Sequence, residues 1–225
     1  MMNTLKEIPA RTYIMIFIAL TVIGGGFYIF SELADEVLEQ EKFIIDQWAS
    51  EFVAQFSNPT LYTFLGWVTE LGSVYTLTFG SIVLVAILAI YYKRRTWRIV
   101  YFIIAMGGIA LLTTGLKSAF SRDRPNILEQ YDGTGHSFPS GHSTAPMVFY
   151  GFIIYLIIRS HLNKAAKWAL NTFLVILILS IGLSRVFLGV HFITDVFAGF
   201  LLGLSWLVTC ILILEYTLWR KGRDI

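Results

Sequence analysis

Long apolar runs, each close to the length of a membrane-spanning helix, divide most of the chain into six segments. A helix needs about 20 predominantly apolar residues to cross the hydrocarbon core of a bilayer. Polar loops or clusters of basic residues separate the runs. The pattern therefore predicts six transmembrane helices, at residues 13–30, 74–92, 97–116, 144–158, 168–183 and 192–219.

A different pattern fills the stretch between the first two runs. Residues 32–58 are rich in Asp and Glu, and their apolar residues recur at spacings of three, four and seven. This spacing is typical of a helix with one apolar and one charged face, so we predict an interfacial helix over residues 35–56. Its role is either packing or a lip at an entrance for lipid. Leu61 to Leu71 then forms a short apolar helix that ends at Gly72.

The composition supports a membrane protein. Hydrophobic residues make up 56% of the chain and charged residues only 14%, whereas a soluble domain carries about 25% charged residues. The net charge of +2 is too small to indicate a nucleic-acid partner. The single cysteine, Cys210, excludes an intrachain disulfide and a cysteine metal cluster. Without a repeat or linker, residues 1–225 are predicted to form one all-α domain.

Basic residues follow three of the apolar runs and predict the orientation in the membrane. Cytoplasmic loops carry an excess of Lys and Arg, so both termini and the loops after Tyr92 and Ile158 are expected to be cytoplasmic. The acidic segment, the loop at 117–142 and the turn at 184–191 then face outward together. Within the last span, the spacing of Gly199 and Gly203 predicts a close contact between helices.

Four polar residues interrupt the apolar pattern near the last two spans: Ser184, Arg185, His191 and Asp195. Charged residues at membrane depth must be paired or line a wet cavity. If Phe192 begins a helix, His191 and Asp195 share a face, and the carboxylate can bind one ring nitrogen while the other acts as nucleophile or base. A buried ion pair that ties two helices together explains this stretch equally well.

The outward loop before the fourth span adds cations and a helix start. Lys117 and Arg124 are seven residues apart and point the same way if the helix continues, which indicates an anionic ligand. Ser140 is a candidate N-cap, and with Gly141 it places backbone N–H groups at a positive helix end where an oxyanion can dock. Together with the histidines, these residues predict a phosphate site.

Three motifs, taken in order, resemble those of the type 2 phosphatidic acid phosphatase superfamily. They are Lys117-x6-Arg124-Pro125, Pro139-Ser140-Gly141-His142 and Ser184-Arg185-x5-His191-x3-Asp195. Every fixed position matches, and the six predicted spans extend the resemblance to the membrane branch of the superfamily. The resemblance implies a lipid phosphatase in the cell membrane, and the orientation predicted from the basic residues places its active site at the outer face.

The resemblance also implies a role for each motif residue. His191 would be the nucleophile that forms a phosphohistidine, Asp195 would orient it, and His142 would protonate the leaving oxygen. The residues that would bind the phosphoryl oxygens are Lys117, Arg124, Ser140, Gly141 and Arg185. Three cations and backbone donors can stabilise the transferred phosphoryl group, so no metal or other cofactor is expected.

The motifs contact the phosphate and not the lipid, so the substrate rests on family likeness alone. Phosphatidylglycerophosphate is the first expectation, and undecaprenyl diphosphate, phosphatidic acid and diacylglycerol pyrophosphate are the alternatives. A transporter is a second class of function, but the chain lacks the internal repeat that is expected of one. A haloperoxidase is a third, and the lipid-embedded layout disfavours it. Two further polar residues are less informative: we expect His136 to be a loop hydrogen bonder and Arg122 to be a head-group contact or a solvated charge.

Overall fold

The computed structural model describes residues 10–40, 43–56, 58–91, 96–125, 131 and 135–221. These residues form eight α-helices and contain no strand. Six segments are long and apolar enough to cross a membrane, which confirms the all-α, six-span prediction. The helices are α1 Ala10–Leu38, α2 Ile44–Ala54, α3 Pro59–Glu70, α4 Val74–Tyr91, α5 Trp97–Phe120, α6 Gly141–Ile158, α7 Lys164–Phe187 and α8 Ile193–Arg220.

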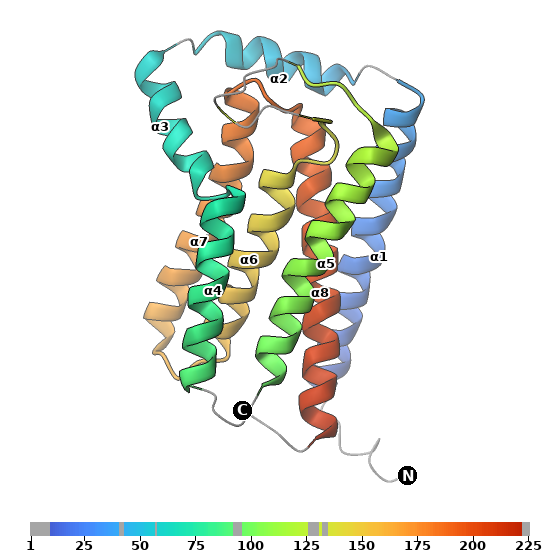
Figure 1. Cartoon of the computed structure of the whole chain (residues 1–225). Coiled ribbons are helices and arrows are strands. Elements are labelled where there is room, and N and C mark those ends of the chain that lie inside the picture. Colours follow the sequence, from blue (N-terminus) through green and yellow to red (C-terminus); the bar gives the residue numbers. More distant parts are fainter. Residues whose placement is uncertain are drawn as a thin grey trace.

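The second span differs from its prediction because two helices share it. The apolar segment that can cross the membrane runs from Pro59 to Ile90 and includes both α3 and α4. Asn58 caps α3 by accepting from the backbone N–H of Thr60 at 2.9 Å, and the helix stops at Glu70. In Figure 1, α3 descends from one end of the bundle and α4 continues beneath it at an angle.

The predicted continuous interfacial helix over residues 35–56 is wrong. Helix α1 extends to Leu38 because Ala34 and Val37 near its end are buried in the bundle. The helix ends before Gln40, whose φ of 59° is left-handed and incompatible with its continuation. Only the second half of the segment, α2, forms a separate helix, and it lies across one end of the bundle (Figure 1).

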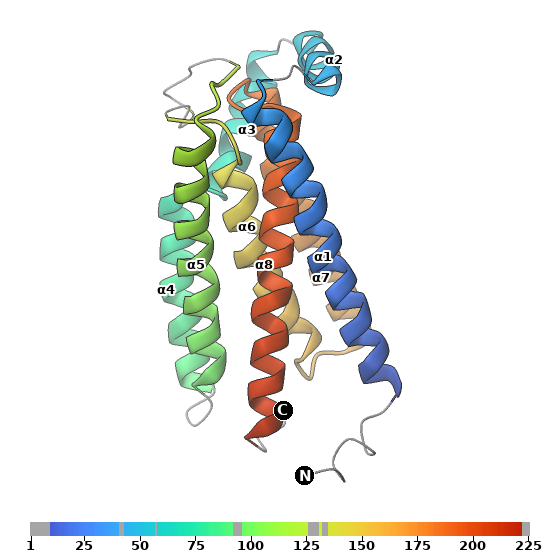
Figure 2. The ribbon, with the colours of Figure 1, turned by 90° about the vertical axis from the view of Figure 1, so that its right-hand side faces the viewer.

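Helix α8 lies at the centre of the bundle and contacts α1, α5, α6 and α7 (Figure 2). Its glycines permit the close approach of α6. A Cβ atom at Gly199 would lie 2.8 Å from Ser143 Cβ, and one at Gly203 would lie 2.8 Å from the carbonyl oxygen of Thr144. The predicted close contact is therefore confirmed, and it holds the first turn of α6 against the first turns of α8.

The alternating helix directions give the bundle two distinct ends (Figures 1 and 2). We call the end crossed by α2 the site end; α5 and α7 finish there, and α6 and α8 begin there. At the other end, the far end, α1 begins and α4 and α8 finish. The basic residues Lys93 to Arg95, which follow Tyr92 and contribute to the predicted orientation, lie outside the described residues.

Candidate active site

The three motifs meet at the site end because each lies where a helix begins or finishes. Helix α5 and the loop after it contribute Lys117 and Arg124, and α7 contributes Arg185 in its last turn. The remaining motif residues come from the starts of α6 and α8: Ser140, Gly141, His142, His191 and Asp195. All of these last five except Gly141 are buried, and Arg185 is buried as well. The structure thus assembles all eight predicted site residues at one end.

His191 and Asp195 are paired through the start of α8. Phe192 is the N-cap, so the helix begins one residue later than expected and His191 precedes it. Asp195, the third residue of the helix, accepts from the backbone N–H of Phe192 at 2.9 Å, and its Oδ2 lies 3.3 Å from His191 Nδ1. A carboxylate at this position satisfies a helix-end donor while it orients the ring.

The second ring nitrogen of His191 is directed at a cation. His191 Nε2 lies 3.1 Å from Arg124 Nη1. Burial lowers the pKa of His191 to about 3, against the opposing hydrogen bond and charge of Asp195. The imidazole is therefore neutral near pH 7. With Nδ1–H donating to Asp195, Nε2 carries the lone pair that a nucleophile or base needs.

Lys117 and Arg124 converge on one carbonyl group, although not along one helix as predicted. Helix α5 ends at Phe120 and Ser121 has a left-handed φ of 48°, so Arg124 lies in the following loop. Lys117 Nζ donates to the carbonyl oxygen of His136 at 2.8 Å, and Arg124 Nη2 approaches the same oxygen at 3.5 Å. The loop backbone therefore brings the two cations together.

Arg185 is positioned by the junction between α3 and α4. Its Nη1 donates to the hydroxyl of Thr69 in the last turn of α3 at 3.0 Å. Gly72, within the junction, packs so closely that a Cβ atom would lie 2.4 Å from Ile181 Cγ2 and 3.4 Å from His142 Cδ2. The break between these two helices therefore forms one wall of the site, beside His142.

Ser140 occupies the predicted N-cap position but its side chain does not cap α6. Its backbone N–H donates to the carbonyl oxygen of Asp195 at 3.1 Å, which joins the starts of α6 and α8. Its buried hydroxyl has no hydrogen-bond partner among the residues that the structure describes. Gly141 begins the helix, where the first N–H groups have no intrahelical acceptor and can bind an oxyanion.

Ser137 is a site residue that sequence reasoning missed. Its hydroxyl donates to Asp195 Oδ2 and lies 3.3 Å from His191 Nδ1, and its backbone N–H donates to the carbonyl oxygen of Arg122 at 2.8 Å. The residue is buried. Its position three residues before Ser140 was the only signal in the sequence, and a serine in a loop is usually solvated.

Arg122 is not a solvated charge, which was one of its two expected roles, because its side chain is only 14% exposed and is paired twice. The other expected role, a head-group contact, stays a prediction. Arg122 Nη1 donates to Asp195 Oδ1 at 2.5 Å and to the hydroxyl of Thr194 at 2.9 Å. Its Nη2 pairs with Asp46 of α2 at 2.8 Å. By contrast, His136 contributes its backbone carbonyl, as the expected loop hydrogen bonder, to Lys117 and Arg124.

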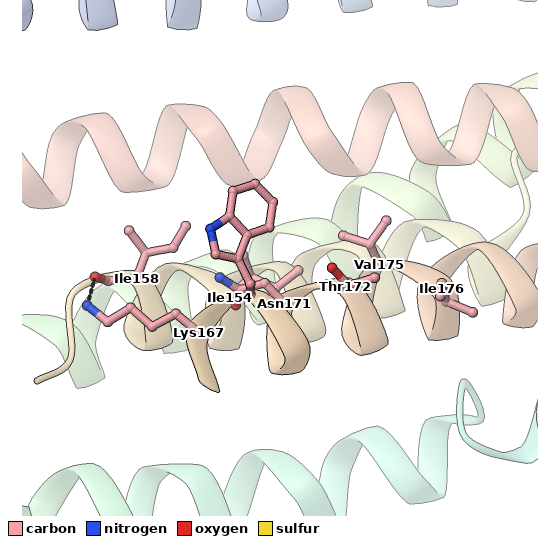
Figure 3. Close-up of a pocket in the computed structure, with 8 residues that line it drawn as sticks. Ile154, Ile158, Lys167, Asn171, Thr172, Val175 and Ile176 are labelled. Carbon is pink, nitrogen blue, oxygen red and sulfur yellow. Dashed lines mark hydrogen bonds between the residues drawn. The ribbon is translucent and has the colours of Figure 1, made fainter. Parts of the chain in front are cut away.

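A cavity of about 480 Å³ lies elsewhere, between α6 and α7 toward the far end (Figure 3). Ile154, Ile158 and Val175 form part of its apolar lining. Lys167 reaches back from α7 and donates to the carbonyl oxygens of Ile158 at 2.8 Å and Ser160 at 2.6 Å, which caps the end of α6. No motif residue lines this cavity, so it is separate from the candidate active site.

The arrangement defines a class of protein. A neutral imidazole oriented by a buried carboxylate, three cations and a helix N-terminus, all at one end of a six-span bundle, suit transfer of a phosphoryl group within a membrane. The family model that describes the PAP2 superfamily matches residues 96–219. The chain belongs to the PAP2 superfamily.

Relatives of known identity agree with this assignment. Phosphatidylglycerophosphatase B of Bacillus subtilis (strain 168) is 30% identical over 161 residues, which cover 71% of this chain and 78% of the relative. The crystal structure of a transmembrane PAP2 type phosphatidylglycerolphosphate phosphatase from Bacillus subtilis is similar, with a TM-score of 0.76 and 28% identity over 87% of this chain and 97% of that chain. The protein is a membrane lipid phosphatase.

A more distant structure shares the fold. Aquifex aeolicus LpxE has a TM-score of 0.59 and 26% identity, over 78% of this chain and 98% of that chain.

Proposed function

We propose that this phosphatase removes the phosphate from phosphatidylglycerophosphate and releases phosphatidylglycerol. The observation that carries the proposal is the likeness, in sequence and in fold, to the phosphatidylglycerophosphate phosphatase of Bacillus subtilis. The motif residues support hydrolysis of a phosphate ester but contact only the phosphate. Undecaprenyl diphosphate, phosphatidic acid and diacylglycerol pyrophosphate therefore remain the alternative substrates.

In the proposed first step, His191 Nε2 attacks phosphorus and the bond from phosphorus to the ester oxygen breaks. The electron pair of that bond passes to the leaving oxygen, which takes a proton from His142. In the second step His142 accepts a proton from water, and the resulting hydroxide attacks the phosphohistidine. Inorganic phosphate leaves and the His191 imidazole is restored. Asp195 and Ser137 hold the ring through Nδ1 in both steps.

The phosphoryl oxygens would be held by Lys117, Arg124 and Arg185 with the backbone N–H groups at the start of α6. Arg124 Nη1 contacts His191 Nε2 at 3.1 Å. A bound phosphoryl oxygen would accept from this donor instead, which frees the Nε2 lone pair to attack. In this proposal Arg124 both binds the phosphate and uncovers the nucleophile.

A panel of lipids tests the substrate. Purified protein in detergent would be given phosphatidylglycerophosphate and each of the three alternatives, and the initial rate of phosphate release would be measured. The expected result is the highest kcat/KM for phosphatidylglycerophosphate. A higher kcat/KM for another lipid would make that lipid the proposed substrate in place of phosphatidylglycerophosphate. The His191→Ala variant gives the background rate.

We further propose that the site faces outward and both termini face the cytoplasm, on the basis of the basic residues beyond three of the spans. Cysteine labelling tests this orientation in a background with Cys210→Ala. Gln55→Cys, at the site end, should react with a membrane-impermeant maleimide in intact cells. His161→Cys, at the far end, should react only after permeabilisation. The reverse pattern would invert the topology.

A further inference from the structure

One buried carboxylate joins α2 to the catalytic end of α8. Asp46 Oδ1 accepts from the backbone N–H of Thr194 at 3.0 Å, and Oδ2 accepts from the Thr194 hydroxyl at 2.8 Å. Oδ2 also accepts from Arg122 Nη2 at 2.8 Å. Because Thr194 directly precedes Asp195, Asp46 holds both the neighbour of Asp195 and the arginine that pairs with it.

Arg122 lies between the two carboxylates in a narrowly defined position. One nitrogen donates to Asp195 and the other to Asp46, and the guanidinium carbon lies 4.3 Å from the ring centre of Phe192 and 5.2 Å from that of Phe43. A planar guanidinium with donors fixed on two sides and aromatic rings against it has little freedom to turn. A continuous chain of contacts therefore runs from α2 through Arg122 and Asp195 to His191.

The other side of α2 is apolar and exposed. Ile44, Ile45, Trp48 and Phe52 each leave more than half of their surface uncovered, while Asp46 faces the bundle. Helix α2 lies across the site end, at its margin, and contacts α7 and α8 (Figure 2). The spanning helices end at this level, where an exposed apolar helix face with a tryptophan fits the boundary between head groups and acyl chains. The surrounding bilayer is thus the partner that this surface fits.

We propose that Arg122 is a positioning residue and that α2, seated in the bilayer surface, aligns His191 through Asp46, Arg122 and Asp195. The rate of the chemical step then depends on the lipid surface even for a substrate that is not a lipid. The inference rests on the proposed phosphate-ester hydrolysis but not on the identity of the lipid substrate. A water-soluble phosphate monoester is accordingly the probe that separates the two.

The first test changes the link itself. Displacement of a reacting group by about 1 Å can cost roughly 10²-fold in rate. Arg122→Lys keeps the charge but loses the two-sided fork, and Asp46→Asn keeps the shape but loses the charge. In both variants kcat for the soluble ester should fall about 10²-fold while KM changes by less than about threefold. The number of vanadate-binding sites per protein should stay at the wild-type value.

Arg159→Lys, at the far end, is the matched control and should keep the wild-type kcat. A merely structural role for Arg122 would predict fewer vanadate sites with an unchanged rate per site, and that result would overturn the inference. An unchanged kcat in both link variants would overturn it as well. A wild-type protein that hydrolyses no phosphate ester would instead remove the proposed function.

The second test changes the membrane surface contact in nanodiscs of phosphatidylglycerol and phosphatidylethanolamine. The double variant Trp48→Gln, Phe52→Gln should lower kcat for the soluble ester by about tenfold, since a polar face seats poorly at the interface. Trp168→Gln is the matched control, because Trp168 is 75% exposed and Trp48 is 68% exposed, and Trp168 lies near the start of α7, the helix that finishes at the site end. In an Asp46→Asn background, the double change should cause no further loss. A full loss in that background, or none in the wild-type background, would refute the coupling.

Discussion

Each end of the bundle contains an ion pair, but the two pairs are buried to different extents. At the site end Arg122 and Asp195 pair with side-chain exposures of 14% and 0%, and the carboxylate also accepts from Ser137 and from the backbone of Phe192. At the far end Arg159 and Glu215 pair with exposures of 39% and 34%. A nearly dry ion pair is costly unless its remaining hydrogen bonds are satisfied, whereas a solvated one costs and contributes little.

The far end shows that a buried cation does not by itself identify an active site. Arg98 is as thoroughly buried there as Arg185 is at the site end. The tyrosine hydroxyl of Tyr155 donates to Glu215 at 2.6 Å, and Lys221 lies 4.0 Å from the ring centre of Trp97. These contacts join α5, α6 and α8. The site end differs because its carboxylate orients an imidazole whose second nitrogen faces a cation.

The largest effect is expected from removal of the proposed nucleophile. His191→Ala should lower kcat by about 10⁴-fold or more, because no other described residue of the motif is placed to attack phosphorus. The acid-labile phosphoenzyme seen after brief exposure to radiolabelled substrate should also disappear. His161→Ala, an exposed histidine at the far end, should behave as wild type. A phosphoenzyme retained in His191→Ala would rule out the assignment.

Isosteric changes at the two carboxylates compare the ends directly. Asp195→Asn should reduce kcat by about 10²-fold to 10⁴-fold, since the ring of His191 loses the acceptor that fixes its tautomer. Glu215→Gln should leave kcat at the wild-type value and lower the free energy of unfolding by about 1 kcal/mol or less. Rates in nanodiscs and melting temperatures in detergent measure both. Equal losses of kcat in the two variants would contradict the assignment of a catalytic role to Asp195 and a structural role to Glu215.

The effect of His142→Ala should depend on the leaving group. General-acid catalysis typically contributes about 10²-fold to 10⁴-fold, and less when the leaving group is already acidic. The variant should therefore lose more activity toward phosphatidic acid, whose leaving group is an alkoxide, than toward diacylglycerol pyrophosphate, whose leaving group is a phosphate monoester. The ratio of the two kcat values, variant to wild type, is the measurement. Identical ratios would contradict the general-acid role.

Removal of metal should have the smallest effect. In the proposed mechanism three cations stabilise the charge that develops on the phosphoryl group, so wild-type kcat should change by less than about twofold in excess EDTA. Activity that vanishes and returns with added magnesium would contradict this prediction. Arg185→Gln tests the same point from the other side. Added magnesium should not restore the activity of this variant, because the ion does not replace the missing guanidinium charge.

Several features of the molecule followed from local sequence. The spans could be predicted because a bilayer admits only long apolar helices, and the glycine contact of α8 with α6 because small residues allow helices to approach. His191, Asp195 and Ser140 could be identified because each lies within a few residues of a helix start. There, the spacing along the chain fixes which groups are neighbours. The error at Arg124 arose where helical spacing was extended past Phe120, beyond the left-handed Ser121.

The sequence by itself determined the number of membrane spans, the family and the eight motif residues, because these depend on apolar run length and on short sequence motifs. Only the tertiary structure decided the partners of Arg122 and Asp46, which are 76 residues apart, and the contact of Thr69 with Arg185, 116 residues apart. It also decided that α1 takes the first part of the acidic segment. Pairing across such separations depends on how the helices pack. The sequence does not distinguish an arginine or aspartate that is solvated from one that forms a buried ion pair.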